Sequence, residues 1–344
     1  MRILIVKHGA LGDVVRTSYF ASALRRKFGE KLELFWVTAP AAESLLADNP
    51  FIDRLTTTFT DLDNFEFDVL YSLDDEASVV TEVAKLKANK ITGAVLENGQ
   101  LTYTSDASQW FDMGLLSKFG KARADEMKIL NRCGHAEIFQ QIFEVDNVLP
   151  EFFLSQEGKF AAERFSDGHA PLVGINPYAG GRWPSKEIRD EELYSLLHAI
   201  GEGRVFSYPV TVILFGAGDD RIRNLTLAKR METSSVKQVI AVADTDASLM
   251  ILAGYISRLQ LMISSDSLAM HLAIAQGIPT LAFFAPTSAS EIDSFGICEK
   301  LLSTASDYCS YAKNCDNSSI TAVRLINKIS AMNINNYSLE TVKD

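Results

Sequence analysis

The chain has 344 residues, of which 47% are hydrophobic and 22% are charged, and its formal net charge is −11. This length favours two domains over one, and the average composition excludes a mainly disordered, fibrous or low-complexity protein. A chain this acidic is a poor general binder of nucleic acid, which requires a basic face, but it can still hold an anion at one local site.

No apolar stretch approaches the ~20 residues of a membrane-spanning helix, and the first apolar run, Ile3–Val6, is shorter than the core of a signal peptide. We therefore expect a cytoplasmic protein. The four cysteines are too few for a disulfide framework. Cys309 and Cys315 could form a metal pair, but no second pair accompanies them, so reduced structural thiols are favoured and no metal is expected.

The N-terminal half alternates short apolar runs with amphipathic segments. Arg2–Val6 is typical of a buried parallel strand, and the spacing of apolar residues after it predicts a helix that ends at Phe28 with Gly29 as its cap. Further elements are expected in order: a strand at 32–37, a strand at 68–73, a helix near 76–86 and a strand at 90–93. This β-α-β pattern indicates a mostly parallel sheet with helices on both faces.

The C-terminal half follows the same plan. Strands are expected at 171–176, 210–215, 236–240, 259–264 and 279–284, and helices at 190–200, 220–231, 246–256, 267–276 and near 319–332. The fold class is therefore α/β, with two doubly wound Rossmann-like domains over residues 1–165 and 166–344. A ligand is expected between them, at the carboxyl ends of the strands.

The first candidate site is the loop after the first strand, where Gly9 and Gly12 precede Asp13. Glycines permit a tight turn and a close backbone approach to a ligand. The G-x-G-x-x-G fingerprint is absent, which makes a nicotinamide-dependent oxidoreductase the poorest choice. Taken alone, Asp13 is explained more simply as a helix cap than as a catalytic group.

The second candidate is the segment in which Asp266 and Ser267 open a helix that carries His271 one turn later. The unpaired N–H groups of a first helical turn make an anion site that suits a diphosphate. A capped, buried helix with a core histidine is the simpler alternative. The cluster as a whole is more specific than any one of its members.

Two further loops follow strands of the second half. The small-residue loop 176–184 carries Arg182, whose guanidinium can bind a phosphate, although it could equally pack on Trp183 at the surface. The loop at 216–220 carries Asp219 and Asp220, which could accept hydrogen bonds from a ribose or cap the next helix.

The order of these segments resembles glycosyltransferase family 9, the heptosyltransferases. The resemblance rests on residues 2–6 and 9–15, on 173–177 with 182–184, and on 265–273 followed by 277–279 and 285–287. It implies a GT-B fold, with the acceptor bound by residues 1–165 and the nucleotide-sugar donor by residues 166–344. It also implies metal-independent, inverting transfer of a sugar, typically heptose from ADP-heptose, to an acceptor hydroxyl of lipopolysaccharide or another surface glycan.

The resemblance places the general base on Asp13, in the acceptor loop that contains Gly9 and Gly12. It places the donor-binding residues on Arg182, Asp220, Asp266, Ser267 and His271. No cofactor is implied beyond the donor, which is expected to be ADP-linked. The acceptor is expected to be a glycan or glycolipid, so the protein could associate peripherally with the cytoplasmic face of the inner membrane.

Three positions depart from the family pattern. Leu268 stands where many members have glycine, and Ala285 replaces the glycine of the usual Gly-Pro-Thr. Gly181 stands where a lysine is usual, so Arg182 is expected to take over the phosphate. These departures keep two alternatives open: a sugar-nucleotide 2-epimerase-like enzyme of the same fold, and a non-catalytic nucleotide-sugar-binding protein. The presence of Asp13 argues against the second, because a binding module does not need a base.

Overall fold

The computed structural model describes residues 1–165, 171–180, 183–236 and 239–332. They form two compact units. The N-terminal unit comprises Met1–Phe153 and the short segment Ser290–Asp293, and the C-terminal unit comprises Leu154–Ala289 and the chain from Ser294 onward. The chain thus passes between the units at Phe153, and the helix α6 (Gln156–Arg164) belongs to the C-terminal unit.

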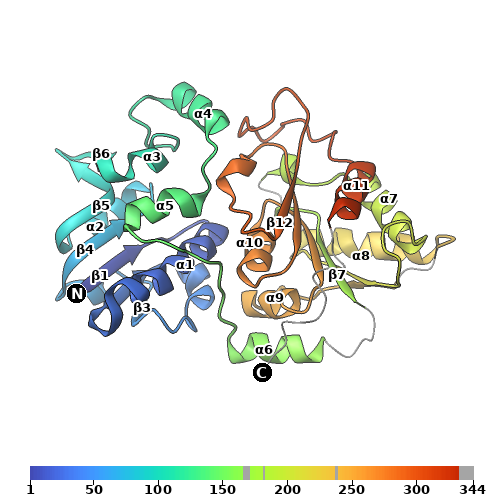
Figure 1. Ribbon diagram of the computed structural model, residues 1–344, viewed down its shortest axis with the longest axis horizontal. Helices are drawn as coiled ribbons and strands as arrows, with labels where there is room; N and C mark the ends of the chain where they lie inside the picture. The colour runs from blue at the N-terminus through green and yellow to red at the C-terminus, as the bar shows by residue number, and fades with distance from the viewer. Residues whose placement is uncertain (166–170, 181–182, 237–238, 333–344) are drawn as a thin grey trace. The chain divides into compact units, whose positions relative to one another are not determined.

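The N-terminal unit is built on one six-stranded sheet with the order β3-β2-β1-β4-β5-β6 (Figure 1). Its strands are β1 (Arg2–Val6), β2 (Glu33–Val37), β3 (Arg54–Thr56), β4 (Glu66–Ser72), β5 (Lys87–Glu97) and β6 (Gln100–Tyr103). Its helices are α1 (Leu11–Phe28), α2 (Ala77–Val83), α3 (Ser108–Phe111), α4 (Lys121–Leu130) and α5 (His135–Phe143). Every pairing is parallel except that of β6 with β5.

The local sequence explains why α1 and β1 form where they do. Residues 3–6 of β1 are fully buried because the strand pairs with β2 on one side and β4 on the other. The helix α1 ends at the predicted residue, since Gly29 adopts a φ of 60° that favours glycine and donates its N–H to the carbonyl of Arg25. Three basic residues in the last turn suit the negative end of the helix dipole.

The C-terminal unit carries a second six-stranded sheet, with the order β12-β11-β10-β7-β8-β9 and parallel pairing throughout. Its strands are β7 (Leu172–Asn176), β8 (Thr211–Leu214), β9 (Val239–Val242), β10 (Leu261–Ser265), β11 (Thr280–Phe284) and β12 (Cys298–Leu302). Its remaining helices are α7 (Asp190–Gly201), α8 (Asp219–Glu232), α9 (Leu249–Ile256), α10 (Leu268–Ala275) and α11 (Ala322–Ala331).

Both sheets have the same connectivity. In each, the first strand lies in the middle, the next two extend to one side, and the fourth begins the other side. This is the Rossmann order, and its direction reverses between β1 and β4 in one unit and between β7 and β10 in the other. Loops that leave such a point diverge to opposite faces of the sheet, which opens a ligand crevice at the carboxyl ends of the strands.

The structure corrects several expected elements. The strand at 90–93 is part of the longer β5, which turns back into β6 through Asn98 and Gly99, both at positive φ. The Asn-Gly pair is a strong hairpin signal, because both residues tolerate the left-handed conformation that such a turn requires.

The helix after residue 240 also begins later than expected. The described part of strand β9 is Val239–Val242, next to residues outside the described ranges, and α9 starts at Leu249 rather than at 246. Ser248 explains the start of α9, because its hydroxyl accepts a hydrogen bond from the N–H of Met250 at 3.1 Å. The structure also adds β3, β12 and the helices between 108 and 143, which the sequence pattern did not indicate.

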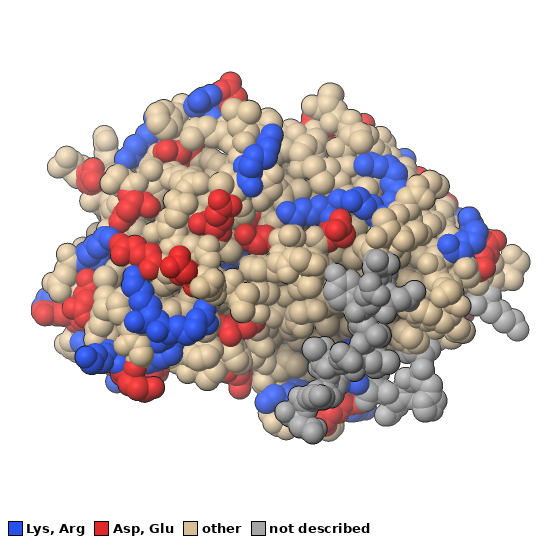
Figure 2. Space-filling view, in the orientation of Figure 1, with Lys and Arg blue, Asp and Glu red and all other residues tan. Residues whose placement is uncertain are grey.

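The surface carries charges of both signs. On the face shown in Figure 2, Lys and Arg side chains are interspersed with Asp and Glu side chains. None of the helices in the described part of the chain is both long and apolar enough to cross a membrane.

Candidate active site

Asp74 organises the loop that follows β1. Its side chain is 6% exposed, and it accepts hydrogen bonds from the Lys7 ammonium at 3.2 Å, from the His8 N–H and from the Gly9 N–H at 3.5 Å. Asp74 follows β4, so these bonds join the two strands at which the sheet reverses direction. Burial lowers the pKa of His8 despite the opposing charge of Asp74.

Asp13 lies in the first turn of α1, directly after this loop. The N-cap position belongs to Ala10, so the expectation that Asp13 caps the helix is wrong. Its carboxylate pairs instead with Arg16, at 2.8 Å from Oδ1 to Nη2, and Lys7 Nζ lies 4.0 Å from Oδ2. With 31% of its side chain exposed, Asp13 is more accessible than Asp74, at 6%.

The φ angles at positions 9 and 12 do not require glycine, because neither is positive. A Cβ atom added to Gly9 would meet nothing within 4 Å. The glycine at this position therefore leaves open space beside the start of α1, where a substrate can approach the backbone.

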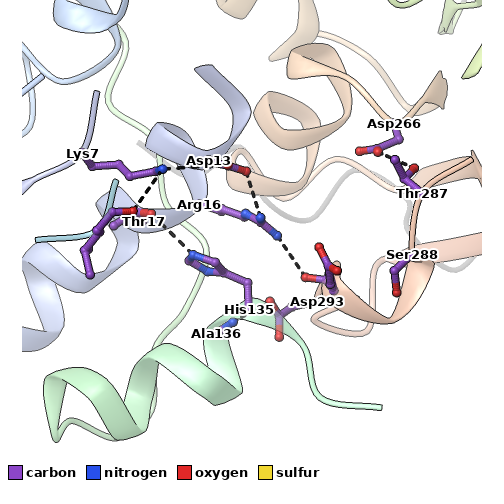
Figure 3. A network of polar contacts seen from close by, with 12 residues as sticks. Lys7, Asp13, Arg16, Thr17, His135, Ala136, Asp266, Thr287, Ser288 and Asp293 are labelled. Carbon is purple, nitrogen blue, oxygen red and sulfur yellow. Dashed lines mark hydrogen bonds and ion pairs between the residues drawn. The ribbon is translucent and has the colours of Figure 1, made fainter. Parts of the chain in front are cut away.

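The segment Ser290–Asp293 completes the N-terminal site (Figure 3). The backbone carbonyl of Glu291 accepts a hydrogen bond from Arg16 Nη1 at 3.1 Å, and Asp293 accepts one from the N–H of Ala136 at 2.8 Å. Ala136 lies in the first turn of α5, where a carboxylate is favoured by the helix dipole.

In the C-terminal unit, Asn176 joins the ends of β7 and β10. Its amide donates to the carbonyl of Tyr178 at 3.0 Å and to the hydroxyls of Ser265 at 3.3 Å and Ser267 at 2.9 Å. Ser265 also donates to the Tyr178 carbonyl, at 2.6 Å. These bonds hold the loop after β7 against the start of α10.

Ser267 occupies the N-cap position of α10, but its hydroxyl does not cap the helix. The hydroxyl instead accepts a hydrogen bond from Asn176 and donates one to the carbonyl of Ser265. The prediction that side chains of Asp266 and Ser267 cap the helix is therefore wrong. The first turn of α10 thus keeps N–H groups that no N-cap side chain satisfies, which is the arrangement that binds anions at helix N-termini.

Asp266 is anchored by two side chains. Lys186 Nζ donates to its Oδ2 at 2.7 Å, and the Thr287 hydroxyl donates to the same oxygen at 2.7 Å. Burial by itself would raise the pKa of this carboxyl, but the Lys186 charge, His271 and the hydrogen bonds hold the pKa below its usual value. His271 is 7% exposed and lies one turn further along α10.

Asp220 is buried in the first turn of α8. Its Oδ2 accepts a hydrogen bond from the N–H of Gly180 at 3.1 Å, which ties α8 to the loop after β7. Arg223 Nη1 lies 3.5 Å from Asp220 Oδ1, and its guanidinium stacks over the Tyr178 ring at 3.7 Å. Gly218, not Asp219, holds the N-cap position of α8, so the expected capping by Asp219 is wrong.

The structure therefore gathers Asp266, Ser267 and His271 at β10–α10, and places Asp220 against the loop after β7. Arg182 lies outside the described residues. In the part of the chain that the structure describes, no three His, Cys, Asp or Glu side chains come together as a metal site. Cys309 and Cys315 are buried, and Cys315 donates to the carbonyl of Asp307 at 3.3 Å.

The sequence analysis missed four residues of these sites: Lys7, Asp74, Arg16 and Lys186. Lys7 and Asp74 follow strands β1 and β4, so the rule that parallel strands end at one edge could have found them. Arg16 lies three residues after Asp13, so the spacing of neighbours on a helix could have paired the two. Lys186 offered no such signal, because its partner Asp266 is 80 residues further along the chain.

Solved structures with a similar fold span nearly the whole chain. A family 9 glycosyl transferase from Veillonella parvula is 19% identical with a TM-score of 0.73, covering 97% of each chain. The E. coli ADP-heptose lps heptosyltransferase II is 16% identical with a TM-score of 0.64, covering 96% of this chain and 98% of its own. The iron-containing dodecameric glycosyltransferase TibC of enterotoxigenic E. coli is 14% identical with a TM-score of 0.53, covering 98% of this chain and 75% of its own. No curated protein matches the sequence.

Two Rossmann-like units in one chain, each with polar residues where its sheet reverses direction, make up the GT-B fold, which the similar structures share. The family model described as glycosyltransferase family 9 (heptosyltransferase) matches residues 108–318, well over half of the chain. The chain belongs to this family and is a glycosyltransferase. The matched region begins after Asp13, so the role of Asp13 depends on the geometry of the N-terminal site alone.

Proposed function

We propose that this glycosyltransferase moves a sugar, most simply heptose from ADP-heptose, to a hydroxyl of lipopolysaccharide or another surface glycan, with inversion at the anomeric carbon. The observation that carries the proposal is the position of Asp13. Its carboxylate is partly exposed, in the first turn of α1, where the strand order of the first sheet reverses direction. The ADP-heptose enzyme of E. coli that shares the fold supports the choice of donor.

In this reaction Asp13 removes the proton of the acceptor hydroxyl while the oxygen bonds to the anomeric carbon. The bond from that carbon to the diphosphate breaks, and its electron pair leaves with the nucleoside diphosphate. General base catalysis of this kind contributes typically about 10²–10⁴-fold. A single displacement from the opposite face inverts the anomeric configuration.

The C-terminal unit offers the groups that such a donor needs. The first turn of α10 and the Lys186 ammonium would stabilise the charge that grows on the departing diphosphate. The resemblance to the family adds Arg182 to this role. Asp220 would accept hydrogen bonds from the ribose, while Asp266, Ser267 and His271 would face the diphosphate and the sugar. This set supplies its own positive charge, so we propose a reaction without a metal or other cofactor.

We also propose that the protein works in the cytoplasm, at the inner face of the membrane that carries a glycolipid acceptor. The N-terminal unit offers exposed apolar and basic residues around α4 that suit such a surface: Leu115, Phe119, Ile129 and Leu130, with Lys118 and Lys121 beside them. Sedimentation with vesicles of anionic rather than neutral lipid would test this placement.

The function is tested by incubation with ADP-heptose, with and without a lipopolysaccharide inner-core acceptor. ADP release and a heavier acceptor that require both substrates would support the proposal. Turnover of the donor without acceptor would point to a 2-epimerase-like enzyme, and binding without turnover under either condition would point to a binding protein. Thermal shifts with ADP-, UDP-, GDP- and TDP-sugars would identify the base, since ligand at about a hundred times its Kd stabilises by roughly 2.7 kcal/mol.

A further inference from the structure

Three different contacts hold the guanidinium of Arg16 in place. Nη2 pairs with Asp13, Nη1 donates to the carbonyl of Glu291, and the cation lies 5.3 Å from the centre of the Trp110 ring. Only 10% of the side chain is exposed. A planar guanidinium fixed in this way limits how the carboxylate bonded to it can rotate.

The two oxygens of Asp13 have different surroundings as a result. Oδ1 takes the charged hydrogen bond from Arg16 at 2.8 Å. Oδ2 is 4.0 Å from Lys7 Nζ, which is within ion-pair range but too long for a hydrogen bond. Lys7 lies closer to Asp74, at 3.2 Å, and also donates to the carbonyl of Leu73.

We propose that Arg16 is a positioning residue whose guanidinium, bonded to Oδ1, fixes the orientation of the Asp13 carboxylate toward the acceptor hydroxyl. This inference rests on the proposed function, in which Asp13 is the base. Arg16 itself does not touch the substrate. It acts through the orientation and the charge state of Asp13.

The charge of Arg16 has a second consequence. A cation beside a carboxylate stabilises the ionised form, and only the ionised form of Asp13 can act as a base. Arg16 therefore extends activity to lower pH, at the cost of some basicity in Asp13. Lys7 and Arg16 are charged groups that contact Asp13. The neighbouring elements contribute further charged and titratable residues to the same network: His8 after β1, Asp74 after β4, His135 on α5, and Glu291 and Asp293 of the short segment.

The test is the pH profile of kcat/KM for transfer in Arg16→Met, with Arg16→Lys as the conservative variant. Loss of the cation should move the acid limb of the profile upward by about one pH unit or more. Loss of orientation should lower kcat roughly ten- to hundred-fold with little change in donor affinity. Arg16→Lys should recover most of the pH profile but less of kcat, because an ammonium lacks the planar fork.

Arg25→Met is the matched control. Arg25 lies on the same helix, is 19% exposed and pairs with Asp53 at 2.6 Å, so its loss should cost similar stability and leave the acid limb in place. A purely structural role for Arg16 would give the same result as Arg25→Met, and that outcome overturns the proposal. If Arg16→Met does not fold, Arg16→Lys provides the test. An unchanged acid limb together with an unchanged kcat in Arg16→Lys would also overturn the proposal.

Asp13→Asn separates this inference from the function on which it depends. If Asp13→Asn has lost transfer while the Arg16 variants keep the parental kcat and pH profile, the positioning role falls and the base stays. If Asp13→Asn transfers sugar at the parental rate, Asp13 is not the base, and both proposals fall together.

Discussion

Lys186 brings a positive charge to the first turn of α10 from a loop 80 residues earlier in the chain. Its ammonium contacts both the Oδ2 and the backbone carbonyl of Asp266, and 17% of its side chain is exposed. The family pattern led us to expect Arg182 as the replacement for a missing lysine at 181. Lys186 is a second cation beside the start of α10, and we propose that it shares this task.

We expect Lys186→Met to raise the Kd of the donor and of its nucleoside diphosphate roughly ten- to hundred-fold, because a hydrogen bond to a charged group contributes about 1.5–3 kcal/mol. Isothermal titration of both ligands measures this. Lys186→Arg should retain most of the affinity, and Lys85→Met, at an exposed lysine of the N-terminal unit, should retain all of it. Equal affinity in the parent and in Lys186→Met would remove Lys186 from the donor site.

At the scale of elements, the two glycines of α6 and α9 decide how closely these helices pack. A Cβ on Gly254 of α9 would overlap the carbonyl oxygen of Gly158, and a Cβ on Gly158 would press on Met250 of α9. Backbone contact of this kind cannot be relieved by turning a side chain. The packing of α6 onto the C-terminal unit thus depends on both glycines.

Gly254→Ala should therefore destabilise the C-terminal unit by about 1–3 kcal/mol, the usual cost of overpacking, although alanine favours helices more than glycine does. Urea unfolding followed by circular dichroism measures the change. Arg258→Ala, at an exposed residue just beyond α9, serves as the control and should stay within about 0.5 kcal/mol of the parent. A stable Gly254→Ala variant would mean that the two helices can move apart freely.

Much of the element order could be predicted, because buried parallel strands such as β1 and β10 appear as short apolar runs between helical patterns. The hairpin at Asn98 and Gly99 was also predictable, because an Asn-Gly pair favours the positive φ angles of such a turn. The site network was less predictable. Arg16 meets Glu291 across 275 residues, and no local pattern encodes a contact of that separation.

At the scale of the whole molecule, the chain passes between the two units three times, after Phe153, Ala289 and Asp293. The short segment between the last two crossings carries the Glu291 carbonyl that holds Arg16. Thr287, four residues earlier, holds Asp266 in the C-terminal unit. One stretch of chain therefore supports the candidate base in one unit and the candidate donor site in the other.

We expect transfer to be independent of added metal, because helix α10 and the cations near it can stabilise the leaving diphosphate. The measurement is the transfer rate after treatment with a strong chelator and desalting, which should equal the rate of untreated enzyme. Loss of activity that magnesium, manganese or iron restores would contradict this expectation. In that case Cys309 and Cys315 would be the first residues to re-examine.

The central claim is that Asp13 removes the proton of the acceptor hydroxyl during sugar transfer, and Asp13→Asn tests it most directly. The asparagine keeps the size of the side chain and removes its basicity. We predict an unchanged thermal midpoint and an unchanged Kd for ADP-heptose, with a transfer rate that falls by about 10²–10⁴-fold. A variant that binds the donor and still transfers heptose at the parental rate would contradict the account.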